Sequence, residues 1–170
     1  MKKTVKKIYK KNCIHICSFF GAFIGIAFVG FLNQMILKQE RLDNTFLIAS
    51  LGATAVLIFG EIKSPLSKPK NVIWGHVIGA FVGVSFYKVF GNSEFLWLSS
   101  AFSVAVSILV MRITKTTHPP GGATALIANI GSEKIKGLGY LFILSPVLTG
   151  VVTILLISLA VNKFFSESID

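Results

Sequence analysis

The feature that most limits how this chain folds is the central stretch 118–124, His-Pro-Pro-Gly-Gly-Ala-Thr. Two consecutive prolines fix φ, remove two backbone donors and disfavour helix at the residue before them. A new helix is therefore expected after them, with the N–H groups of its first turn unpaired. The apolar run from Gly121 to Ile130 has ten residues, about 15 Å of helix or half a hydrocarbon core. A half-length helix that begins bare beside His118 is a geometry that binds anions.

Composition places the chain in a membrane. Of its 170 residues 53% are hydrophobic and only 14% are charged, whereas globular domains carry about 25% charged residues. The net charge is +10, but six of the basic residues fall within the first eleven positions, directly before an apolar run. Such a cluster sets membrane topology and contacts anionic lipid. We therefore expect the lipid bilayer as a partner and no nucleic acid.

Six apolar segments follow the basic tail and predict an all-α membrane protein. The tail is assigned to residues 1–12 and a single transmembrane domain to residues 13–170. Four segments are long enough to cross a bilayer and two are short. The long segments are expected at residues 15–37, 71–90, 95–114 and 138–161, and the short ones at 45–60 and 121–130.

The two short segments share a sequence. Gly52-Ala-Thr-Ala returns as Gly122-Ala-Thr-Ala seventy residues later, and each copy lies between two longer segments. The chain thus divides into repeats of approximately 13–90 and 95–162, with the second segment of each repeat short or broken. Three crossings per repeat place the two copies in opposite orientation, the inverted-repeat plan of many transporters.

The distribution of Lys and Arg bears on the number of crossings. Six crossings put twelve basic residues on the N-terminal side and five on the other, whereas re-entrant short segments and four crossings give eight and nine. The positive-inside rule favours six crossings with a cytoplasmic N-terminus. A bacterial inner (plasma) membrane is the default location.

Polar and glycine residues near the two breaks form the candidate site, because polar groups inside a membrane are usually functional. His118 could donate to an anion, carry a proton or hold the turn. The glycines allow close backbone approach or helix packing, and the threonines contact a ligand or bond back to their own helix. Asn71 and His76 fit a pathway or an interfacial cap. The candidate substrate-binding residues are His118, Gly121, Gly122, Thr124, Gly52, Thr54, Asn71 and His76.

The sequence does not favour an enzyme. It has no paired carboxylates within the apolar segments, no Ser-His-acid spacing, no phosphate loop and no metal-ligand cluster. Cys13 and Cys17 lack the further ligands that a metal site needs. We expect no catalytic residues, no cofactor and no metal. Gly21 and Gly25 allow another helix to approach closely, and packing within the chain is favoured over contact in a homo-oligomer.

The central stretch resembles the signature of the HPP family of integral membrane proteins. The resemblance covers most of the chain from Ser50 to Asn162, with three motifs in the right order. The matching stretches are 117–127, 50–60, 64–76 and Leu138-Gly-Tyr, together with the closing apolar span. Plant plastid and cyanobacterial members are described as nitrite transporters, which implies an anion pathway here. The family is usually described with four spans, a count that the charge distribution disputes.

Three positions depart from the family pattern. Lys68, Lys70 and Trp74 stand where Gln, Arg and Gly are common. Trp74 places a bulky ring close to His76, which bears on the substrate rather than on the fold. The predicted function is passage of a small anion, nitrite first, through the two Gly-Ala-Thr-Ala breaks. A neutral-solute or water channel and a non-transporting membrane sensor or scaffold stay open as alternatives.

Overall fold

The computed structural model describes residues 2–37, 49–91 and 94–167, and these ranges contain helices and turns but no strand. Four stretches of helix are long and apolar enough to cross a membrane. They lie in α1 (Lys2–Leu37), α3 (Pro69–Phe90), α4 (Leu96–Ile113), and η3 (Ile143–Leu148) with α7 (Thr149–Glu167). The all-α membrane architecture is confirmed. The basic stretch is continuous with the first span, because α1 already begins at Lys2.

Two shorter apolar helices complete the architecture. The first is Ala49–Gly60, whose last turn, η1 (Val56–Gly60), is π-helical. The expected residues 45–48 lie outside the described ranges. The second is α5 (Pro120–Ile130), which begins at the second proline and ends before Gly131. Proline suits the first turn because its fixed φ is helical and its missing N–H would have no partner there.

The connections are more structured than expected. The segment before α3 contains the 3₁₀ turn η2 (Pro65–Ser67), and Ser64 accepts from the Leu66 N–H. The stretch between α5 and the last span contains the short helix α6 (Glu133–Gly137), for which the sequence predicts no segment. The last span, expected from Leu138, begins at Ile143 and is interrupted where Ser145 is extended (φ −140°, ψ 125°). Pro146 follows, and a residue before proline avoids the helical region.

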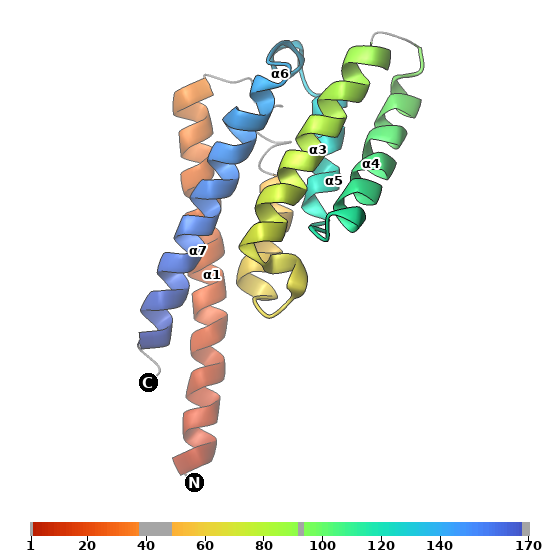
Figure 1. Ribbon diagram of the computed structural model, residues 1–170. Coiled ribbons are helices and arrows are strands. Elements are labelled where there is room, and N and C mark those ends of the chain that lie inside the picture. The colour runs from red at the N-terminus through yellow and green to blue at the C-terminus, as the bar shows by residue number, and fades with distance from the viewer. Residues whose placement is uncertain (1, 38–48, 92–93, 168–170) are drawn as a thin grey trace.

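The helices alternate in direction along the chain. In Figure 1, α1 and α3 both run away from the end of the molecule that carries the two termini, and α4 and α7 run back toward it. α5 is parallel to α3, since Gly75 faces His118 and Gly79 faces Gly121. The helix 49–60 runs opposite to α3, because the chain turns between them at η2.

Two clusters of buried apolar side chains hold the helices together. One joins α1, the helix 49–60, α7 and the start of α3, and the other joins α3, α5, α6 and η3. The first contains Val29, Leu51, Ala55, Ile58, Phe59, Val72, Val151, Ile154 and Leu155. The second contains Ala80, Val84, Ile127, Ala128, Ile135, Phe142 and Val147.

Glycines set the closest helix contacts. A Cβ at Gly79 or Gly83 of α3 would collide with the backbone carbonyl of Gly121 or Ala125 in α5. Small residues allow such contact, and tight packing matters in lipid because apolar burial gives helices little drive to associate. On α1, Gly21 and Gly25 receive the ring of Phe59 from the same chain. The interpretation that these two glycines pack within the chain is confirmed.

Candidate functional site

The first turns of the two short helices meet inside the protein. Ser50 Oγ lies 2.9 Å from Thr124 Oγ1 and donates to the Pro120 carbonyl at 3.1 Å. Ser50 and Thr54 are four residues apart, as are Pro120 and Thr124, so each pair shares one helix face. The repeated Gly-Ala-Thr-Ala sequence therefore brings two hydroxyl-bearing faces together.

Two histidines extend this contact. His76 of α3 places Nδ1 2.7 Å from Thr124 Oγ1 and Nε2 2.8 Å from Thr54 Oγ1. His118 places Nε2 3.0 Å from the same Thr54 hydroxyl and Nδ1 2.9 Å from the Leu66 carbonyl. The centres of the two imidazole rings are 5.1 Å apart. We call Ser50, Thr54, His76, His118 and Thr124 the histidine cluster.

The histidine cluster is closed off from the surface. The exposed fraction of each of its five side chains is 2% or less. Polar side chains are costly to bury unless they find hydrogen-bond partners, and every member of the cluster has at least two. Such complete pairing fixes the positions of both imidazoles.

Backbone breaks bring His118 to this place. After α4 the chain turns through Lys115, which has a positive φ of 55°, and the Thr116 N–H donates to the Met111 carbonyl at 2.8 Å. Gly75 of α3 then leaves room for the His118 side chain, since a Cβ at position 75 would overlap with the Cβ of His118. The two prolines thus end one helix and start another with His118 held between them.

The start of α5 differs from the expected bare N-terminus. The N–H groups of Gly121 and Gly122 donate to the carbonyls of His118 and Pro119, both at 2.9 Å. The expectation that first-turn N–H groups are unpaired is therefore wrong at these two residues. The tight proline turn provides 3₁₀-type partners, and the donors at the junction are side chains instead.

The remaining candidate residues lie around the cluster without joining it. Gly121 packs against the Gly75 carbonyl. Among the residues that the structure describes, a Cβ at Gly122 would meet only Val104, at 3.7 Å, and one at Gly52 would meet nothing within 4 Å. Asn71 donates to the carbonyls of Pro65 and Thr117 at 3.0 and 3.3 Å. Asn71 therefore ties η2 to the residue before His118 and acts as a positioning group.

Ser50 is the member of the cluster that sequence reasoning missed. Ser50 is not among the candidate substrate-binding residues that the sequence indicates. Its spacing of four residues from Thr54 was the available signal, because residues four apart share a helix face. The Leu66 carbonyl had no sequence signal at all, since any residue can place a carbonyl there.

A second buried polar group, outside the predicted site, surrounds Asn129 of α5. Its Oδ1 accepts from Ser99 at 2.7 Å, and its Nδ2 donates to Ser103 Oγ at 2.8 Å and to the Gly83 carbonyl at 3.2 Å. No titratable side chain takes part in these bonds. The group joins α3, α4 and α5, and its role is structural.

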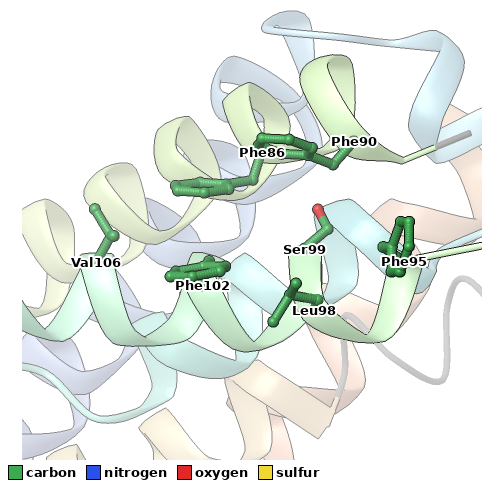
Figure 2. Close-up of a pocket in the computed structure, with 7 residues that line it drawn as sticks. All are labelled: Phe86, Phe90, Phe95, Leu98, Ser99, Phe102 and Val106. Atoms are coloured by element: carbon green, nitrogen blue, oxygen red, sulfur yellow. The ribbon is translucent and has the colours of Figure 1, made fainter. Parts of the chain in front are cut away.

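Two hollows mark the outer surface of α3 and α4. One, of about 380 Å³, is lined almost wholly by apolar side chains (Figure 2). These are Phe86, Phe90, Phe95, Leu98, Phe102 and Val106, with Ser99 as the polar member. The other, of about 360 Å³, is lined by Lys70, Trp74, Ile78, Thr114 and Thr116. Both hollows expose mainly apolar surface, and Lys70, Thr114 and Thr116 are the polar members of the second.

Comparison with known proteins agrees with the resemblance seen in the motifs. Residues 10–169 match the family described as "HPP, transmembrane region". Two transmembrane proteins of Dictyostelium discoideum are 39% identical over 149 residues and 40% identical over 148 residues. The alignments cover 86% and 85% of this chain but 47% and 50% of the relatives, so the chain spans about half their length. No solved structure matches it. Four apolar spans and a family match over almost the whole chain establish that it belongs to the HPP family of integral membrane proteins.

Proposed function

We propose that the protein carries a small anion, nitrite first, across the membrane through the junction of the two short helices. The observation that supports this most is the histidine cluster, where hydroxyl and imidazole donors from both repeats converge in a buried position. A buried set of donors without a carboxylate is suited to an anion rather than to a metal cation.

The arrangement of the helices supports an inverted repeat. α1, the helix 49–60 and α3 run in alternating directions, and α4, α5 and α7 alternate in the opposite sense. The first repeat therefore corresponds to the second turned upside down, with six passages of the chain. Transporters of this plan bind substrate where broken helices of the two repeats meet.

Helix electrostatics favour a negative ion at the junction. A helix carries about half a positive charge at its N-terminus, and α5 begins beside the hydroxyl of Ser50, which donates to the Pro120 carbonyl. This partial charge of α5 favours a negative charge beside it. A small planar anion that accepts from Thr54, Thr124 and an imidazole would provide this negative charge.

Closure of the cluster favours a carrier over an open channel. The five side chains are at most 2% exposed, so an ion reaches them only after the helices move. The hollow with Lys70 and Trp74, beside the Gly75 contact with His118, provides the approach from one side. With the N-terminus cytoplasmic, as the basic residues predict, this approach is on the cytoplasmic side.

Nitrite uptake into proteoliposomes tests the proposal. We expect uptake above that of empty liposomes, and its loss in His118→Ala and His76→Ala. His15→Ala, at an exposed position on α1, is the matched control and should retain uptake. Uptake of a neutral solute that nitrite does not compete with would favour a water or neutral-solute channel. A folded protein with no solute flux would favour the sensor or scaffold.

A further inference from the structure

Hydrogen bonds through the histidine cluster connect two backbone carbonyls in a chain of six links. Thr54 and Thr124 each have one further acceptor, the carbonyls of Ser50 and Pro120, both at 3.3 Å. The chain runs from the Pro120 carbonyl through Ser50, Thr124, His76, Thr54 and His118 to the Leu66 carbonyl. The six links have donor–acceptor distances between 2.7 and 3.1 Å. Both ends are pure acceptors, and every group between them can both donate and accept.

Counting protons shows that the chain is one short. Three hydroxyls and two neutral imidazoles carry five protons for the six links. The Leu66 carbonyl can only accept, so His118 holds its proton on Nδ1 and accepts at Nε2 from Thr54. His76 must then donate from Nε2 to Thr54 and accept at Nδ1 from Thr124. Ser50 donates its proton to the Pro120 carbonyl and Thr124 donates its own to His76, so the contact between the hydroxyls of Ser50 and Thr124 is left without a proton.

One additional proton fills all six links. When His76 becomes an imidazolium it donates to Thr124, which turns to donate to Ser50, and Ser50 continues to donate to the Pro120 carbonyl. A second additional proton would make both rings imidazolium with their centres 5.1 Å apart, and two like charges this close in a buried site repel each other. We infer that the histidine cluster is a binding site for a single proton, shared between His76 and His118 through the hydroxyl of Thr54.

Transfer between the two histidines changes only two links. His76 passes its Nε2 proton to Thr54 Oγ1 while Thr54 passes its own proton to His118 Nε2. His76 then keeps the Nδ1 proton, and His118 carries protons on both nitrogens. Thr54 ends with one proton as before, so the charge has moved from one ring to the other without an ionised hydroxyl.

The surroundings make this proton depend on an anion. The charged side chains on the neighbouring elements are all exposed: Glu61 after the helix 49–60, Lys63 and Lys68 before α3, Lys70 and Lys88 on α3, Arg112 on α4, Lys115 before α5 and Lys163 on α7. Among the described residues no carboxylate is bonded to the cluster. An unpaired buried cation is unfavourable, and the N-terminus of α5 opposes it further. The anion is then the counter-ion, and proton and anion enter together in a ratio of one to one, an extension that rests on the proposed transport.

Nitrogen NMR of histidine-labelled protein in nanodiscs tests the proton site directly. A His15→Gln background leaves the two cluster histidines, and spectra are recorded from neutral to acidic pH with and without nitrite. We expect one imidazolium equivalent in total, divided between His76 and His118, at a higher pH when nitrite is present. Two full imidazolium signals in the folded protein, or none even while nitrite is transported, would overturn the site.

Thr54 provides the matched pair of variants. Thr54→Ser keeps the hydroxyl and should give the wild-type spectrum, whereas Thr54→Val removes both shared links and should confine the charge to one ring. Identical spectra for the Ser and Val variants would contradict sharing through Thr54. The same spectra distinguish failure of the proton site from failure of the proposed transport. If one proton is shared between the rings and nitrite does not change its pH dependence, the proton site stands and nitrite is not its counter-ion. Nitrite flux with two neutral rings keeps transport and removes the proton site.

Discussion

The helix 49–60 and α5 carry the same Gly-Ala-Thr-Ala sequence but are held in the protein by different means. α5 lies against the glycines of α3 and inserts Asn129 among the serines of α4. The helix 49–60 instead places Phe59, at the corresponding repeat position, against Gly21 and Gly25 of α1. The short helix is thus held by hydrogen bonds of an amide in one repeat and by packing of an aromatic ring in the other. The shared sequence is retained only in the first turn, where the two helices meet each other.

The largest effect is expected from substitutions that remove the threonine hydroxyls where the two short helices meet. Thr54→Val and Thr124→Val each remove two links of the histidine cluster. Leaving buried partners unsatisfied costs about 1–3 kcal/mol, so nitrite uptake in proteoliposomes should fall by roughly ten- to a hundredfold. Thr54→Ser and Thr124→Ser should retain uptake, and Thr153→Val on α7 is the control for an ordinary Thr→Val change. A loss confined to Thr124→Val would show that α5 carries the site alone.

The next largest effect concerns the contact of α5 with α3. Gly79→Ala places a Cβ against the Gly121 carbonyl, and a backbone group cannot move aside. We expect destabilisation of about 1–3 kcal/mol, measured as a lower melting temperature in detergent. Gly52→Ala, where a Cβ meets no described residue within 4 Å, is the matched control. Equal melting temperatures for the two variants would mean that α5 is not pressed against α3.

Position 129 separates the two ways of holding a short helix. Asn129→Leu removes the bonds to Ser99, Ser103 and the Gly83 carbonyl, and should cost about 1–2 kcal/mol, since interhelical hydrogen bonds in membranes are modest. Phe59→Leu, at the corresponding position, keeps an apolar side chain and should cost less than about 1.5 kcal/mol. The same unfolding measurement compares them. A larger loss of stability for Phe59→Leu than for Asn129→Leu would indicate that the Phe59 contact contributes more to stability than the hydrogen bonds of Asn129.

The smallest expected effect lies at the paired glycines Gly52 and Gly122. Neither would place a Cβ within 3.4 Å of another described residue, and alanine is the better helix former by about 0.5–1 kcal/mol. Alanine at either position should leave the melting temperature unchanged or slightly raised, and uptake unchanged. Lost uptake with an unchanged melting temperature would instead give these glycines a role in the approach of the anion.

Sequence patterns were sufficient for the four spans, for the two short apolar helices and for the centre of the candidate site, but not for α6. Apolar length gave the four spans, and the repeated tetrapeptide with the proline break marked Thr54, Thr124 and His118, which the structure brings together. Helix pairing was harder to predict. Gly75, Gly79 and Gly83 are spaced by four in the sequence, yet the partner of such a stripe depends on tertiary packing. The Leu66 carbonyl was out of reach for the same reason, because a main-chain acceptor has no residue type.

The position of the histidine cluster also has a mechanical consequence. Ser50 and Thr54 belong to a helix anchored in the apolar cluster with α1 and α7, whereas Thr124 belongs to a helix anchored in the apolar cluster with α3 and α6. Side-chain hydrogen bonds of Ser50 and Thr54 therefore connect two parts of the protein that are packed into different apolar clusters. Separation of the helix 49–60 from α5 breaks these hydrogen bonds, and their return to contact forms the bonds again. We therefore expect a covalent cross-link between the helix 49–60 and α5 to keep the histidine cluster closed and to prevent release of a bound anion.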